Sequence, residues 1–228
     1  MRSGEADMHF RLPKPLHGWR ALAGEVGIIV LGVLIALGAG QVVETIHWRE
    51  SVSQMREAMR AELAVDRMRA EVNLAQDPCI GARLDAILRW ASTAPAGARI
   101  ANADQPYLWN YHTSTWDITK TSPAAGHFSL KEQLMFAGAY DAIANEQRYL
   151  FNEQGSWTEL AATLESADRP DNRDRIEREV AIARLHLATR EANGRSLLAR
   201  LDEMRIKPDP RGLPKSTDVR RLCRPLEG

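Results

Sequence analysis

The feature that most constrains this chain is a run of residues without any charged side chain, residues 26–43. It belongs to a longer apolar segment, residues 21–43, whose one charged side chain is Glu25 near its beginning. The hydrocarbon core of a bilayer is about 30 Å thick and is crossed by roughly 20 apolar residues in a helix. Trp19 and Trp48 flank the segment, as expected of aromatic rings at the two membrane interfaces. The sequence therefore predicts a transmembrane helix over residues 21–43.

Two other structures are also compatible with an apolar segment of this kind. One is a cleaved signal peptide, for which Ala36, Leu37 and Gly38 would supply a cleavage site of small residues. The other is a buried helix of a soluble protein. The apolar run is longer than the apolar region of a typical signal peptide, and no proline or polar break follows it. Soluble core helices seldom run this long without charge, so we expect a span that stays in the mature protein.

Small residues recur inside the segment at Gly32, Ala36 and Gly40. A spacing of four places them on one helix face, where a second helix can approach closely in a membrane. Glu25 lies seven residues before Gly32 and so projects from nearly the same face. We expect this face to form a helix–helix contact, with a homo-oligomer as its simplest product. Glu25 either takes part in that contact or reaches the headgroup region.

The two cysteines of the chain, Cys79 and Cys223, both follow the span. An even pair on one side of a membrane is typical of a disulfide in an oxidising compartment, although two unrelated thiols are the alternative. Neither cysteine has a second metal ligand at close spacing, which argues against a metal site. The basic residues of the tail, residues 1–20, favour its cytoplasmic placement only slightly over the residues that follow the span. Together these features predict a cytoplasmic tail and a non-cytoplasmic domain over residues 44–228.

Residues 44–228 show helical periodicity throughout, and no alternation of period two persists. The helix of the span continues to residue 75, where Asp77 and Pro78 are expected to stop it. Further helices are expected over residues 79–92, from 129 to about 152 or through 154, over 157–166, and from a cap at 171 or 172 to about 204. Ser129 and Glu132 form a capping box, and Leu130 and Leu134 are expected on the buried face of the helix that follows. The predicted fold class is all-α: one N-terminal transmembrane helix that continues into a helical bundle.

Aromatic residues are concentrated in residues 106–128, where the sequence pattern predicts neither a helix nor a strand. They form either a core beneath a loop or a pocket, and the candidate pocket residues are Trp109, Tyr111, His112, Trp116 and His127. Phosphate-loop, dinucleotide and zinc-helix motifs are absent, so no cofactor, metal or catalytic residue is predicted. The formal net charge is zero and no basic stripe occurs, which argues against nucleic acid as a partner. Glu62 and Asp66 are helical neighbours that we expect on a solvated face.

The block from His17 to Leu37, with Gly-Glu-Val followed by Gly-Val-Leu-Ile-Ala-Leu, resembles a family of bacterial single-span membrane proteins. Residues 59–63, and Cys79 and Cys223 with the prolines beside them, are similar to further features of that family. The resemblance implies residence in the bacterial inner membrane. It carries no activity to this chain, because the family is uncharacterised.

Two functional hypotheses follow. The first is a membrane-anchored interaction or assembly protein, with the bilayer, a second copy and an unknown protein as partners. The second is a membrane-tethered enzyme or small-ligand sensor that uses the region from Trp109 to His127. A closed pocket with convergent polar groups in that region would favour the second hypothesis. A filled aromatic core would favour the first.

Overall fold

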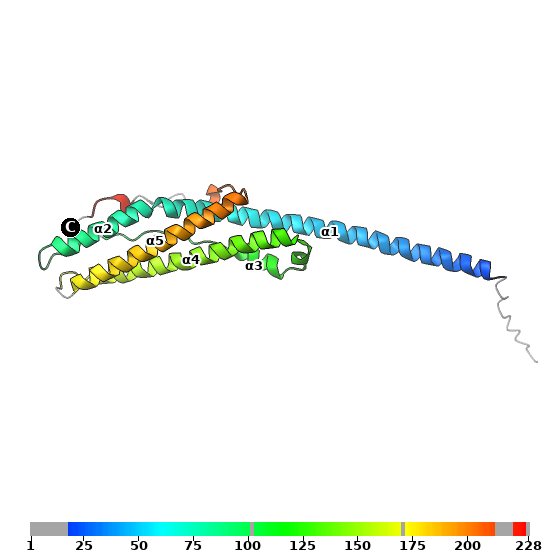
Figure 1. The fold of residues 1–228 in the computed structure, drawn as a ribbon, viewed down its shortest axis with the longest axis horizontal. Coiled ribbons are helices and arrows are strands. Elements are labelled where there is room, and N and C mark those ends of the chain that lie inside the picture. Colours follow the sequence, from blue (N-terminus) through cyan, green and yellow to red (C-terminus); the bar gives the residue numbers. More distant parts are fainter. Residues whose placement is uncertain (1–17, 101–102, 170–171, 213–220, 227–228) are drawn as a thin grey trace, which may run out of the picture. The chain divides into compact units, whose positions relative to one another are not determined.

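The computed structural model describes residues 18–100, 103–169, 172–212 and 221–226. Helices dominate these residues, and no strand occurs among them, which confirms the predicted all-α class. Most of the predicted tail, residues 1–17, lies outside the described residues. The elements are α1 (Trp19–Ala75), α2 (Asp77–Thr93), α3 (Ser114–Thr121), η1 (Pro123–His127), α4 (Leu130–Leu164), α5 (Arg173–Glu203), η3 (Pro210–Gly212) and η4 (Arg221–Cys223) (Figure 1).

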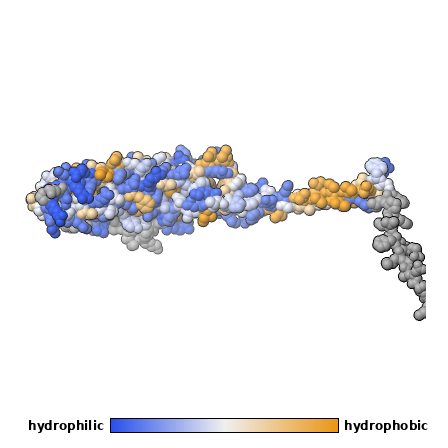
Figure 2. Space-filling view, turned by 90° about the horizontal axis from the view of Figure 1, so that it is seen from below, coloured by the Kyte–Doolittle hydropathy of each residue, from blue (hydrophilic) through white to orange (hydrophobic). Residues whose placement is uncertain are grey.

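The chain divides into two compact units, residues 1–50 and residues 51–228. The first unit contains the apolar section of α1, which Figure 2 shows as a continuous hydrophobic band. Every residue from 18 to 47 is exposed. In the described part of the chain, α1 is the one helix that is long and apolar enough to cross a membrane, a test that a signal sequence would also pass.

The second unit is a helical bundle in which α5 packs against both α2 and α4. Residues 51–75 of α1 join the same core. A large apolar side chain that is fully buried removes its surface from water and contributes about 1.5–3 kcal/mol. The largest buried apolar side chains of this core are Met59, Leu63, Ile80, Leu84, Ile87, Phe136, Tyr140, Ile143, Leu150, Trp157 and Leu160.

Local sequence signals account for the ends of two helices. The capping box at the start of α4 is present: Ser129 Oγ accepts from the Glu132 N–H, and the Glu132 carboxylate accepts from the Ser129 N–H. The break between α1 and α2 falls at Gln76, and α2 begins at Asp77, earlier than predicted. Pro78 lies in the first turn of α2, where its missing N–H leaves no helical bond unmade.

Two predictions about α4 are wrong. The helix runs without interruption through Gly155 to Leu164, because a helical glycine costs only about 1 kcal/mol and burial of Trp157 and Leu160 offsets it. Leu130 and Leu134, predicted to be buried, are 70% and 65% exposed. Phe136 faces the core, and a difference of two residues places Leu134 on nearly the opposite side of the helix.

Candidate functional site

The aromatic stretch begins with an extended segment that a buried asparagine holds against the bundle. Asn73 of α1 is fully buried, and its amide nitrogen donates to the Trp109 carbonyl at 2.9 Å. Its amide oxygen accepts from the Trp109 N–H at 2.7 Å. The Tyr111 N–H donates to the Gln147 side chain at 2.6 Å. Side chains of α1 and α4 thus satisfy backbone groups that a neighbouring strand would satisfy in a sheet.

Asp66 continues this row of contacts about two helical turns before Asn73. It is fully buried, so its predicted placement on a solvated face is wrong. Both of its carboxylate oxygens lie 3.1 Å from the His112 backbone nitrogen, which donates to them. Burial raises the pKa of the Asp66 carboxyl to about 7, although this hydrogen bond and the charge of Arg69 oppose the change. Asp66 therefore serves the fold by holding the residue that follows Tyr111.

The five candidate pocket residues do not converge on one cavity. Trp109 and Tyr111 are buried in the core, 8% and 7% exposed. His112 is exposed, and its ring lies within 3.1 Å of the Arg69 guanidinium. His127 is also exposed, at the end of η1. Trp116 lines a cavity, and the other four residues are not among the lining residues of that cavity.

That cavity has a volume of about 260 Å³ and lies between α3, η1 and α4, with α1 behind it. The ring of Trp116 stacks on Tyr140 at 5.3 Å between centroids, with the two planes only 8° apart. The Tyr140 hydroxyl donates to the Glu62 carboxylate at 2.9 Å. Most of the lining is apolar, and the lining residues are Met59, Trp116, Thr119, Lys120, Ala125, Phe128, Gln133, Leu134, Phe136 and Ala137.

A cluster of charged side chains lies inside the bundle, and no sequence motif indicated it. Arg190 of α5 is fully buried and forms ion pairs with Asp77 of α2 and Glu153 of α4. Asp77 is 6% exposed and Glu153 fully buried. Burial raises the pKa of both carboxyls, that of Asp77 to about 6, although Arg190 opposes the change. One guanidinium thus joins three helices.

Glu146 is a third carboxyl beside this cluster, in which the single charge of Arg190 already faces the two carboxyls of Asp77 and Glu153. It is fully buried, and neither carboxyl oxygen has a hydrogen-bond partner among the described residues. Burial raises its pKa to about 8, against the attraction of Arg190, so the folded chain holds it protonated at neutral pH. The absence of a side chain at Gly194 leaves space for the Glu146 carboxyl. A Cβ at that position would lie 3.0 Å from Glu146 Oε1 and 3.2 Å from Leu74 Cδ2.

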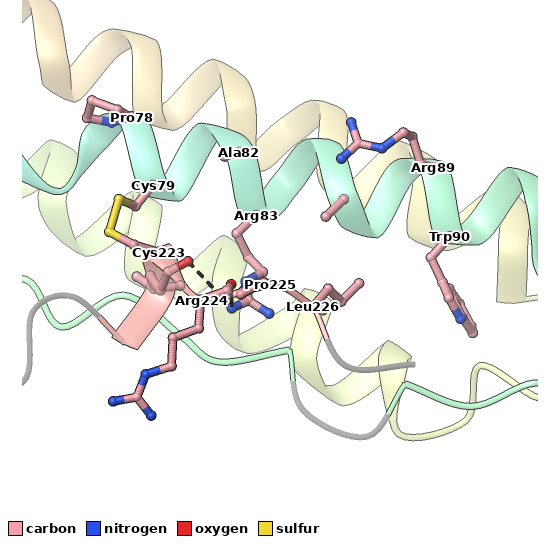
Figure 3. Close-up of a pocket in the computed structure, with 12 residues that line it drawn as sticks. Pro78, Cys79, Ala82, Arg83, Arg89, Trp90, Cys223, Arg224, Pro225 and Leu226 are labelled. Atoms are coloured by element: carbon pink, nitrogen blue, oxygen red, sulfur yellow. Dashed lines mark hydrogen bonds between the residues drawn. A yellow bond between two sulfur atoms is a disulfide. The ribbon is translucent and has the colours of Figure 1, made fainter.

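The disulfide joins Cys79 of α2 to Cys223 of η4, with a Cα–Cα distance of 4.8 Å. Figure 3 shows Arg83 reaching from α2 to the same C-terminal segment, where its Nη2 donates to the Arg224 carbonyl at 2.8 Å. A cavity of about 590 Å³ lies beside these residues. Arg89 and Arg224 point away from each other in Figure 3, so their two guanidinium groups do not face a common point.

The small-residue face of the span lies in the first unit. A Cβ added at Gly32 or Gly40 would meet nothing within 4 Å, and Ala36 between them is exposed. Glu25 is exposed as well. These residues leave a surface of α1 that no other described residue of the chain covers.

No protein-family model, no curated protein and no solved structure matches this chain. Within the described ranges, no group of three or more histidine, cysteine, aspartate or glutamate side chains is placed to hold a metal ion.

Proposed function

We propose that this chain is a membrane-anchored assembly protein of the bacterial inner membrane, which self-associates through its span. Residues 21–43 are the anchor, residues 1–20 the cytoplasmic tail, and residues 44–228 the periplasmic domain. The face formed by Gly32, Ala36 and Gly40 is the contact between copies, with Glu25 beside it. The observation that carries the proposal is the apolar section of α1, which is exposed along its whole length (Figure 2).

An exposed apolar helix of this length is costly in water, because its surface is hydrated without compensation. A bilayer removes that cost. Within the bilayer the hydrophobic effect no longer drives helices together, and close backbone packing between small residues becomes the main attraction. The disulfide supports the placement of residues 44–228 on the oxidising side of the membrane, because such bonds persist in the periplasm and are rare in the cytosol.

The alternative, a membrane-tethered enzyme or small-ligand sensor that uses residues 109–127, receives less support in its enzyme form. Trp109 and Tyr111 are core residues held by Asn73, and the two histidines of the stretch do not line the cavity beside Trp116. That cavity favours ligand binding over catalysis, because its walls are mostly apolar.

A genetic reporter of transmembrane association tests the proposal. Residues 21–44 should give a strong association signal, and Ala36→Leu should weaken it, because the larger side chain separates the backbones while the segment stays apolar. Gly38→Leu is the matched control: the same kind of enlargement on the opposite helix face should leave the signal unchanged. A monomer-level signal for the native span would refute self-association. Equal signals from Ala36→Leu and the native span would show that another face makes the contact.

A further inference from the structure

Two uncharged polar residues, Thr119 and Gln133, line the cavity between α3, η1 and α4, and both donate their hydrogen bonds to backbone carbonyls of the fold. The Thr119 hydroxyl donates to the Thr115 carbonyl at 2.7 Å. The Gln133 amide donates to the carbonyls of Ala125 and Phe128, each at 3.1 Å. A ligand in this cavity would therefore bind by apolar contact and not by hydrogen bonds to its walls.

The walls of the cavity are held in place before any ligand arrives. Trp116 stacks on Tyr140, whose hydroxyl is fixed by Glu62 of α1. The Phe128 ring has the guanidinium of Arg56 over it at 5.9 Å. A preformed cavity avoids the cost of ordering side chains on binding, so apolar contacts in it translate more fully into affinity.

The mouth of the cavity combines apolar and cationic side chains. Leu134 lines it and is 65% exposed, and Leu130, one turn earlier on α4, is 70% exposed. Lys120 also lines the cavity; its side chain is 50% exposed and its ammonium lies 2.6 Å from Asp117. Because the Lys120 ammonium is already paired with Asp117, the exposed aliphatic side chains at the mouth are what complement an apolar chain that enters the cavity.

We propose that this cavity binds the methyl end of the acyl chain of a long-chain fatty acid, and that the rest of the chain and the carboxylate stay outside it. The volume of about 260 Å³ is just below the roughly 300–1,000 Å³ of typical small-ligand pockets, so it holds part of such a chain and not all of it. This inference rests on the proposed function, because the membrane anchor is what keeps residues 44–228 close to the lipids that supply a fatty acid.

Photolabelling of the full chain tests this site. The oxidised protein is reconstituted in phosphatidylcholine nanodiscs with palmitic acid that carries a diazirine near its chain end, irradiated, and digested for mass spectrometry. Label is expected on peptides that contain Trp116, Phe128 or Leu134, and excess unlabelled palmitate should remove it. Ala137→Leu, which fills the cavity from its lining, should reduce this label at least several-fold. Ala144→Leu, at an exposed position of the same helix outside the lining, should not.

The label on the span separates the two proposals. Label on residues 21–43 without label at the cavity would overturn the fatty-acid site and leave the membrane anchor standing. Label at the cavity without any on the span would support the site and contradict the anchor. If a second copy occupies the cavity instead, Leu134→Cys should oxidise to a linked dimer and the cavity peptides should stay unlabelled, which would also overturn the proposal.

Discussion

Replacement of Glu146 by glutamine should remove much of the pH dependence of the stability of this protein. The substitution keeps the shape of the side chain and removes its ionisation. In the folded chain Glu146 is fully buried without a hydrogen-bond partner among the described residues, and burial raises its pKa from 4.5 to about 8. In the unfolded chain the carboxyl regains its ordinary pKa. Between these two values the folded state therefore binds more protons than the unfolded state, and the free energy of unfolding falls as the pH rises.

The size of the effect follows from the two pKa values. Each unit of pKa corresponds to about 1.4 kcal/mol, so the interval from 4.5 to about 8 corresponds to about 5 kcal/mol. The contribution is fully present below pH 4.5, declines as the pH rises, and is lost above pH 8. Asp66 and Asp77 act in the same direction, because burial raises their pKa values to about 7 and about 6.

Urea unfolding of the oxidised full chain in mild detergent, followed by circular dichroism between pH 5 and pH 9, measures this slope. The native protein should lose stability across the range, and Glu146→Gln should flatten the curve, mainly at its alkaline end. Glu159→Gln, at an exposed position of the same helix, should leave the slope unchanged. Identical slopes for the native protein and Glu146→Gln, or a native protein that gains stability at alkaline pH, would refute the reasoning.

Two further substitutions test the packing and the covalent closure of the bundle. Gly194→Ala should lower the free energy of unfolding by about 1–3 kcal/mol, because the new Cβ would crowd Glu146 and Leu74; an unchanged denaturation midpoint would contradict this. Removing the bond between Cys79 and Cys223 should cost about 4–5 kcal/mol by the chain-entropy model. Intact mass before and after reduction and alkylation checks that the bond exists, and two thiols that alkylate without reduction would disprove it.

Much of the fold could be predicted from the sequence, because the signals involved are local. The uncharged run, the capping box of Ser129 and Glu132, and the proline after Asp77 each act within a few residues. The continuation of α4 through Gly155 was missed because the compensation comes from Trp157 and Leu160, whose burial depends on other helices. The exposure of Leu130 was missed for a related reason: an apolar residue at a helical spacing does not reveal which face the bundle covers.

The buried charges are the largest failure of sequence reasoning. Asp66 and Glu146 have the spacing of solvated helix residues, and charged residues are rarely buried. Their burial becomes intelligible only when distant partners are known: the His112 backbone for Asp66, and the room that Gly194 leaves for Glu146. The glycine inside α5 was the one available signal, since a glycine in the middle of a helix often marks close packing.

The start of the mature chain in the membrane is the measurement that tests the membrane anchor most directly. Membranes of the native host are washed at alkaline pH to remove peripheral proteins, and the protein is then extracted for intact mass and N-terminal sequencing. We expect it to stay in the washed membranes with a mature N-terminus before Leu22, so that residues 21–43 are retained. A protein released by the wash, with an N-terminus near Ala39 or Gln41, would show that the apolar segment is a cleaved signal and would contradict the anchor and the contact between spans.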